Sequence, residues 1–512
     1  MLPRKFYKDN RKIPLGFMLL TTTLFFYYLS LHKETVSNFD IPTEQHDYKA
    51  EVPSATSESL QAQLQAQRNI QIEEYYAKSE HQPEASSDTP SDSSSAPLYT
   101  PPAPDYASQG ALKTSEITLL LKTGASLVWK RLPIHLLTSL APERIAPENT
   151  IIYSDVPDVI GSHQLVDVLA NTSSRTVLES PDFQPYLLQE DFDDKQGWIE
   201  GDIAGPIGGW KLDKYKFLPL INHAGHSQPD AKWYIYMEDD AFIFLPNLLQ
   251  HLATFDWQDT WYVGSLAIKH GEIFAHGGAG FALSRGAWEK SFGADKNIIE
   301  KYENFTEAHG CGDHVLGHVL KDYGVTFGET HEAEQFTFGF SPESYWSTWF
   351  GEANWCKPIF SMHHMHAKDI SRSYNMEKAW DLAQNGLMRH RDIYRTFIAP
   401  VIGRRIEWWD NRSSSHAITS SEAKAGENMY VPASVKSRDS WLKSWESVDN
   451  CEDACLAWPE CVQWSFYEDL CKMSDRVVLG TGYTAKDPRR LTALKTTSGW
   501  VPKRIERWTC DN

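Results

Sequence analysis

The first hydrophobic pattern of the chain is a long uncharged run near its start. Residues 13–31 are mostly apolar and carry no charge, and a basic cluster precedes them: Arg4, Lys5, Lys8, Arg11 and Lys12. As a helix rising roughly 1.5 Å per residue, the run spans about 28 Å, which is enough to cross the hydrocarbon core of a bilayer. It does not end in the small-x-small pattern of a cleavage site. The pattern predicts an uncleaved signal anchor, with a removed signal sequence as the alternative.

The charge flanking this run predicts its orientation. Basic residues favour the cytoplasmic side, so residues 1–12 are expected to be a cytoplasmic tail and everything after the anchor is expected in the lumen, a single-pass type II topology. Residues 32–112 differ in composition, with six Pro and seven Ser in residues 81–110 alone. Such a segment buries too little apolar area to offset its chain entropy. We therefore predict a disordered stem.

The pattern changes to alternating strands and helices at residue 117. Residues 117–122 read as a buried strand, residues 128–140 as a helix and residues 151–154 as a second strand. In open sheets of this kind, ligands lie at the carboxyl ends of the strands. Thr123 and Asp155 follow the two strands and are candidate nucleotide contacts. Ordinary turn residues are the alternative for both.

A run of three acidic residues follows the next apolar strand. Residues 233–237 are apolar, Glu238, Asp239 and Asp240 come where this strand should end, and residues 241–245 are apolar again. Adjacent carboxylates in such a place repel one another and raise their pKa values unless a cation intervenes. Hard oxygen ligands favour Mg²⁺ or Mn²⁺. A solvated acidic turn is the alternative.

Composition narrows the possible partners. The chain has 49 Lys and Arg against 68 Asp and Glu, a formal charge of −19. A protein that binds the nucleic-acid backbone needs a basic surface, so this balance argues against polymeric nucleic acid. Aromatic residues make up 12% of the chain and can stack on sugars, although most aromatic side chains are core residues. Trp346, Trp349 and Trp355 are candidates for a sugar-stacking wall, with the core as the alternative.

Taken together, the motifs resemble those of a known family. Their order is similar to that of the fringe-like glycosyltransferase family 31, of the fungal type, whose members have a GT-A fold. The resemblance implies an α/β domain over residues 113–410, with a GT-A-type (Rossmann-like) mixed sheet flanked by helices. The segments that carry it are Leu121–Arg131, Tyr153–Asp155, Gly209–Phe217, Glu238–Asp240, His276–Arg285 and Gly312–Gly317.

The resemblance also implies a donor and a metal. The donor would be a UDP-sugar, held with Mn²⁺ or Mg²⁺, and the metal ligands would be Asp240 and His363. Residues 361–366 contain three imidazoles, so His364 and His366 remain alternatives to His363. The residues expected to contact the donor are Thr123, Arg131, Asp155, Lys214, Glu238, Asp239, Gly278 and Gly280.

Asp313 is the candidate catalytic base. An inverting transfer needs a group that takes the proton of the acceptor hydroxyl, and the resemblance assigns this role to Asp313. The apolar stripe after it makes a helix N-cap the alternative role. We expect a hexosyltransferase of the Golgi membrane that forms a β linkage, by resemblance to a 3-hydroxyl, on a glycan or glycoprotein acceptor. The alternatives are a catalytically silent glycan-binding protein on the same scaffold and a glycosidase with paired carboxylates.

The cysteines and glycan acceptor sequences agree with a lumenal location. All seven Cys follow the anchor, and Asn171, Asn304 and Asn411 each begin an Asn-x-Ser/Thr sequence. Seven is odd, so one thiol stays free or pairs with another chain. We hypothesise a bridge between Cys311 and Cys356, which would join the base loop to the metal loop. Zinc is the alternative for the C-terminal cysteines, although no CxxC pair occurs.

A second, smaller module is expected at the end of the chain. A polar stretch, residues 411–436, is predicted to be a linker, and residues 437–512 to be a small disulfide-stapled α+β module. The spacing Cys451-x3-Cys455-x5-Cys461-x9-Cys471 resembles the PAN/apple fold. By resemblance such modules bind proteins or glycans, and a purely structural role is the alternative.

Overall fold

The computed structural model describes residues 112–195, 208–328, 339–424, 429–484 and 495–510. The predicted cytoplasmic tail, the anchor and all but the last residue of the predicted stem lie outside these residues. Within the part that is described, no helix combines the length and the apolar character needed to cross a bilayer. All described residues belong to one compact unit, Ser91–Asn512.

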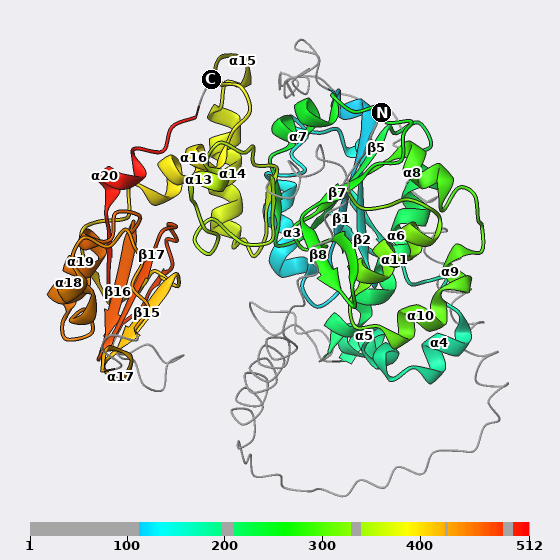
Figure 1. The fold of residues 1–512 in the computed structure, drawn as a ribbon. Coiled ribbons are helices and arrows are strands. Elements are labelled where there is room, and N and C mark those ends of the chain that lie inside the picture. The colour runs from blue at the N-terminus through cyan, green and yellow to red at the C-terminus, as the bar shows by residue number, and fades with distance from the viewer. Residues whose placement is uncertain (1–111, 196–207, 329–338, 425–428, 485–494, 511–512) are drawn as a thin grey trace, which may run out of the picture. The chain divides into compact units, whose positions relative to one another are not determined.

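The centre of the fold is a mixed seven-stranded sheet (Figure 1). Its spatial order is β3-β4-β2-β1-β5-β10-β7, in which β1 runs parallel to β2 and β5, whereas β10 runs antiparallel to β5 and β7. All six residues of β1 are buried, as expected for a strand with helices on both faces. The strands are β1 (Ile117–Lys122), β2 (Thr150–Ser154), β3 (Asp158–Ile160), β4 (His163–Asp167), β5 (Trp233–Glu238), β7 (Tyr262–Gly264) and β10 (Phe281–Ser284).

Helices cover both faces of this sheet and make two separate cores. On one face, α6 and α11 contribute apolar residues such as Leu220 and Leu316, and on the other α3 and α7 contribute residues such as Leu132 and Leu248. The predicted α/β alternation is confirmed, although the first helix ends at Leu136. The helices are α3 (Val128–Leu136), α4 (Ser174–Glu179), α5 (Gln184–Lys195), α6 (Asp213–Ser227), α7 (Leu245–Leu252), α8 (Arg285–Lys290), α9 (Ile298–Lys301), α10 (Glu303–Ala308) and α11 (Gly312–Asp322).

A second, small sheet extends the chain beyond the acidic triplet. Its order is β11-β12-β6, and β6 (Phe242–Ile243) pairs antiparallel with β12 (Ser361–Met362), while β11 (Phe340–Ser341) pairs parallel with β12. One residue separates Asp240 from β6, and His363 directly follows β12. This pairing therefore brings the segments of Asp240 and His363 together. The elements around it are α13 (Glu352–Trp355), α14 (Ala367–Ala379), α15 (Leu382–Asn385), α16 (His390–Ile393) and the single π-helical turn Tyr394–Ile398.

The C-terminal module is a five-stranded sheet with two helices beside it. The strand order is β13-β19-β16-β17-β15, and two disulfides, Cys451–Cys471 and Cys455–Cys461, staple α19 and the segment after it. The main elements are β13 (Ile406–Glu407), β15 (His416–Thr419), β16 (Gln463–Tyr467), β17 (Leu470–Ser474), β19 (Thr497–Trp500), α18 (Arg438–Leu442) and α19 (Val448–Ala457). Short elements complete the described chain: β8 (Leu266–Lys269), β9 (Glu272–Ala275), β14 (Trp409–Asp410), β18 (Thr481–Gly482), α17 (Ser420–Ala423) and α20 (Pro502–Ile505).

The structure differs from the predicted linker at residues 411–436. The segment includes β15, which adds to the edge of β17, and its residue Ile418 is fully buried in the core of the module. Asn411 is also fully buried and its side-chain amide donates to the carbonyl oxygen of Trp464. The sheet of the module therefore begins before residue 437, and Asn411 cannot accept a glycan in the folded chain, whereas Asn171 and Asn304 are exposed.

The cysteine pairing also differs from the hypothesis of a Cys311–Cys356 bridge. Cys356 pairs with Cys510, across 154 positions of sequence, and Cys311 is the free cysteine of the chain. Cys311 instead lies with its sulfur 2.9 Å from Lys269 Nζ. The long-range bridge therefore connects the segment before β12 with the end of the C-terminal module.

Candidate active site

Two buried lysines occupy the carboxyl edge of the main sheet. Lys122 is the last residue of β1 and pairs in register with Glu238, the last residue of β5. Its Nζ atom lies 3.3 Å from Glu238 Oε1 and 3.3 Å from Asp213 Oδ2. Burial alone would lower the pKa of Lys122, but the two carboxylates outweigh burial and raise it. The lysine is therefore a permanent positive charge beneath the strand ends.

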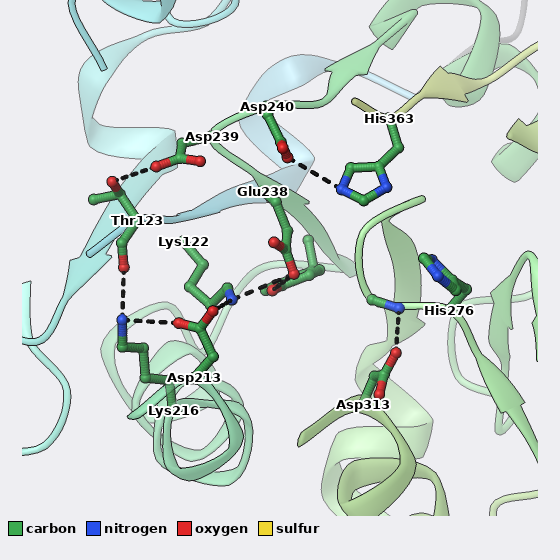
Figure 2. A network of polar contacts seen from close by, with 12 residues as sticks. Lys122, Thr123, Asp213, Lys216, Glu238, Asp239, Asp240, His276, Asp313 and His363 are labelled. Atoms are coloured by element: carbon green, nitrogen blue, oxygen red, sulfur yellow. Dashed lines mark hydrogen bonds and ion pairs between the residues drawn. The ribbon is translucent and has the colours of Figure 1, made fainter. Parts of the chain in front are cut away.

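Lys216 extends this network to β2. Its fully buried Nζ atom donates to the carbonyl oxygen of Thr123 at 3.0 Å and lies 3.0 Å from Asp213 (Figure 2). The same atom lies 3.2 Å from Asp155. Burial would raise the pKa of Asp213, but Lys122 and Lys216 outweigh burial and lower it to about 2. Asp155 also accepts a hydrogen bond from the backbone N–H of Ala125 at 2.6 Å. The ends of three parallel strands are thus held by two lysines from β1 and α6.

The three consecutive carboxylates face three different sets of partners. Glu238 contacts Lys122, whereas buried Asp239 accepts hydrogen bonds from Thr123 Oγ1 at 2.6 Å and Arg131 at 2.8 Å. Burial raises the pKa of Asp239, although Arg131 and Thr123 oppose this shift. The repulsion that the sequence suggests is therefore relieved in large part by built-in cations. Only the third carboxylate, that of Asp240, turns toward histidines.

Asp240, His363 and His364 form the candidate metal centre. Their ligand atoms lie within 4.8 Å of one another, with Asp240 Oδ1 3.1 Å from His363 Nε2 and Asp240 Oδ2 3.9 Å from His364 Nδ1. Burial would lower the pKa of His363 and raise that of Asp240, but their mutual attraction outweighs burial in both. Arg131 lies 3.2 Å from the same carboxylate.

The hydrogen bonding of His363 fits a cation at this position. The carbonyl oxygen of Pro342 lies 3.3 Å from Nδ1, so Nδ1 carries the proton and donates it. Nε2 then faces the carboxylate of Asp240, and without a bound cation the raised pKa of His363 favours a proton on this atom. Two lone pairs that face each other across 3.1 Å need a proton or a cation between them. One carboxylate oxygen and one or two imidazoles are a donor set that Mn²⁺ accepts and that leaves positions for other ligands.

A glycine turn joins the metal centre to the candidate base. A Cβ atom at Gly278 would lie 2.1 Å from the ring of His363, and Gly280 has a positive φ of 80°, with no room for a Cβ atom beside the carbonyl of Tyr236. The preceding N–H of Gly277 donates to Asp313 Oδ2 at 2.8 Å. The short turn between β9 and β10 therefore contacts the imidazole of His363 through Gly278 and the carboxylate of Asp313 through Gly277 (Figure 2).

Asp313 lies in the first turn of α11 without capping it. The helix begins at Gly312 and its N-cap residue is Cys311, so Asp313 is the second helical residue. Its Oδ1 accepts the backbone N–H of His314 at 2.8 Å. The N-cap alternative is therefore wrong, and the carboxylate is instead half-buried and directed to the glycine turn.

His276 is a functional candidate that the sequence reasoning missed. The backbone N–H of Ala279 lies 3.1 Å from His276 Nδ1, which makes Nδ1 an acceptor and leaves the proton on Nε2. Burial lowers the pKa of this imidazole, and its ring centre is 5.8 Å from that of His363. A neutral imidazole with a fixed N–H donor therefore lies between the base and the metal centre. In the sequence, its position directly before the glycine turn was the feature that could have indicated a role at the site.

The structure does not bring every predicted residue to this site. Lys214 lies on α6, but its Nζ atom contacts Asp182 at 2.8 Å and the carbonyl of Glu307 at 2.7 Å. The lysine that reaches the strand ends is Lys216, two residues later, which the sequence analysis did not single out. Lys122 and Asp213 were missed as well, although their charge inside apolar elements was a usable signal.

One histidine candidate and one tryptophan candidate also lie away from this site. His366 is 74% exposed on its side chain and contacts Asp369, not Asp240. Trp355 is buried in a core shared by the α/β domain and the C-terminal module, as expected for a core residue, whereas Trp346 and Trp349 are half-buried. Of the three imidazoles in residues 361–366, the structure therefore leaves His363 and His364 as candidate ligands.

Part of the chain is similar to a known protein family. Residues 112–332 match the family model of Fringe, described as Fringe-like. The matched segment contains β1, the acidic triplet, the glycine turn and the start of α11, and it ends before β12 and the histidines. The central mixed sheet flanked by helices is consistent with a GT-A-like fold, and the match supports the class of fringe-like glycosyltransferases for this part of the chain.

Proposed function

We propose that the chain is a metal-dependent, inverting glycosyltransferase that moves a hexose from a UDP-sugar to a hydroxyl of a glycan or glycoprotein. The observation that carries the proposal is the Asp240–His363–His364 group at the end of β5, next to Asp313 across one glycine turn. The Fringe-like match over residues 112–332 supports the same class of reaction. The resemblance of the motifs favours a β linkage to a 3-hydroxyl.

The donor would lie along the carboxyl edge of the sheet. Thr123, Arg131 and Asp155 follow or face strand ends, where α/β sheets bind nucleotides. Arg131 is partly exposed and can extend to a phosphate while it remains beside Asp239 and Asp240. A divalent cation bound by Asp240 and His363 would neutralise the charge that develops on the leaving diphosphate.

The acceptor side would be organised by Asp313. Its carboxylate, held by the N–H groups of Gly277 and His314, would take the proton of the attacking hydroxyl as the new bond forms. The Nε2–H of His276 is available to orient an oxygen of either sugar. Glu238 stays paired with Lys122 and would act on a ribose or sugar hydroxyl, not as a second base.

A Golgi membrane location, with the catalytic domain in the lumen, completes the proposal. It rests on the uncharged run at residues 13–31 with basic residues before it, and on the two described Asn-x-Ser/Thr sequences that are exposed. Three disulfides among the described residues also suit an oxidising compartment.

A panel of donors tests the proposal. The full chain, purified in detergent, is heated with Mn²⁺ and UDP-galactose, UDP-glucose or UDP-N-acetylglucosamine, and release of UDP is measured in parallel. We expect one donor to raise the melting temperature only with metal, and we expect its turnover to disappear with a chelator and in Asp240→Asn. Donor binding without any turnover would favour the silent glycan-binding scaffold. Activity that survives the chelator would contradict the proposed metal dependence.

A further inference from the structure

One segment contacts the loop that carries the candidate metal ligands. It comprises residues 342–356, between β11 and β12, and we call it the tryptophan segment. Its first residue, Pro342, accepts the Nδ1–H of His363. Further along, the hydroxyl of Tyr345 donates to Asp369 Oδ1 at 2.7 Å, and the ring of Trp346 lies parallel to that of His366 at 6.0 Å. The loop that carries the candidate metal ligands thus rests on this segment.

The tryptophan segment has little regular structure of its own. It contains one four-residue helix, α13, and the strands on either side of it, β11 and β12, have two residues each. Its internal backbone hydrogen bonds are those of short turns, such as the bonds from Thr348 to Ser344 and from Trp355 to Gly351. Segments without long helices or strands open at low free-energy cost unless other elements hold them. A fixed position for Pro342 therefore needs support from outside the segment.

The C-terminal module supplies backbone bonds to it. Phe350 and Val477 exchange two backbone hydrogen bonds, each of 2.7 Å, and the N–H of Gly480 donates to the carbonyl of Trp346 at 2.8 Å. Arg412 donates from its guanidinium to Ser347 Oγ at 2.6 Å. Both ends of the segment's central turn are therefore bonded to the module.

Side chains and a disulfide reinforce these bonds. The guanidinium of Arg412 lies over the ring of Trp346 at 5.6 Å and that of Arg476 over the ring of Trp349 at 4.5 Å. The disulfide Cys356–Cys510 closes the end of the segment, and Trp355 packs edge-on against Trp508 with ring centres 5.2 Å apart. Two arginines, one disulfide and one aromatic pair thus clamp fifteen residues.

We propose that the C-terminal module is a positioning element of the metal centre, which fixes His363 through the tryptophan segment. The inference rests on the proposed function, since it assigns a role toward the same metal ligand. The partners of a metal-bound imidazole fix its tautomer and ring orientation, and their loss weakens metal binding by about 10- to 100-fold. The module therefore acts within the catalytic unit, not as an independent binding domain.

The test removes both guanidinium groups that contact the tryptophan segment. In Arg412→Gln with Arg476→Gln, we expect Mn²⁺ to bind about 10-fold more weakly by electron paramagnetic resonance titration. We also expect faster amide hydrogen exchange in residues 361–366 without metal. A matched control is Lys443→Gln with Lys472→Gln, which removes two cations inside the module: Lys443 pairs with the exposed Asp439, and Lys472 lies over the ring of Tyr467. The control should bind Mn²⁺ and exchange like the parent chain.

Two readouts separate this inference from the proposed function. If the parent chain binds no Mn²⁺, the proposed function fails, and hydrogen exchange of residues 361–366 still decides whether the module fixes the loop. If hydrogen exchange of residues 361–366 in Arg412→Gln with Arg476→Gln equals that of the control, the positioning role is wrong. Cys356→Ser with Cys510→Ser is a second variant that leaves both arginines in place. We expect it to shift exchange and Mn²⁺ affinity in the same direction, and parent-like behaviour in both clamp variants would overturn the inference.

Discussion

Two groups of carboxylates at the edge of the main sheet differ in what neutralises them. Asp155, Asp213 and Glu238 each lie within 3.3 Å of a buried lysine. Among the described residues, Asp240 contacts Arg131 and two histidines, and Asp313 is hydrogen-bonded by backbone N–H groups. The negative charges of the first group are neutralised by lysines of the protein itself. The carboxylates of the second group can also contact a cation or a substrate hydroxyl.

This difference shows why adjacency in sequence is a poor guide to role. Glu238 and Asp240 are two positions apart, but one closes an internal ion pair and the other faces a candidate metal centre. Removing one partner of a buried ion pair mainly lowers the stability of the fold. A carboxylate with a free lone pair mainly affects binding or proton transfer when it is changed. Substitutions in the two groups should therefore separate into effects on stability and effects on activity.

The largest effect is expected from Asp313→Asn. The amide cannot take a proton, and general-base catalysis contributes about 100- to 10,000-fold, so we expect turnover to fall by about 1,000-fold. The melting temperature should stay close to that of the parent chain, because no lysine loses its partner. Steady-state kinetics with the best UDP-sugar measure the loss. Turnover within a few-fold of the parent would remove Asp313 from the role of base.

Lys216→Met should produce the largest change in stability. The substitution leaves Asp155 with no cation in a buried site, and breaking such a pair costs about 3 kcal/mol. Urea denaturation measures the free energy of unfolding. Lys214→Met is the matched control, since this lysine is on the same helix but contacts Asp182 nearer the surface. Equal effects of the two substitutions would show that the buried network has no special weight.

His363→Gln should weaken Mn²⁺ binding by about 30-fold with little change in stability. Loss of the Nε2 atom removes a direct ligand in our proposal, and losing even a partner that orients a ligand costs about 10- to 100-fold in metal affinity. His366→Gln is the control, because its side chain is exposed and does not contact Asp240. Isothermal titration with Mn²⁺ compares them, with His364→Gln as the intermediate case. A larger loss in His366→Gln would exchange the assigned roles.

The smallest effect concerns the acid stability of the lysine network. The pKa of Asp213 is lowered to about 2 in the folded chain, so its contribution is fully present above about pH 4 and is lost as the pH falls toward 2. The side chain is 44% exposed, so solvent screening keeps this contribution below about 1 kcal/mol. The free energy of unfolding of the parent and Asp213→Asn should converge between pH 4 and pH 2. A constant difference would contradict the assignment.

Local patterns predicted the elements of the α/β domain well. The strands before Thr123, before Asp155 and at the acidic triplet are confirmed, because each is a short apolar run with a polar residue at its end. The same patterns could not predict that β15 joins the C-terminal sheet, since the polar residues around Ile418 resemble a linker. They also could not predict the pairing of Cys356 with Cys510, because any pairing depends on which surfaces meet.

The sequence by itself determined the α/β class, the order of the motifs and the chemistry available at the strand ends, because hydrophobic periodicity and residue type are local properties. Only the tertiary structure decided which carboxylate faces the histidines and which carboxylate pairs with a buried lysine. The register of β1 with β5 places Lys122 beside Glu238, and the pairing of β6 with β12 places His363 beside Asp240. These contacts join residues more than a hundred positions apart, so their energies depend on the packing of the whole domain.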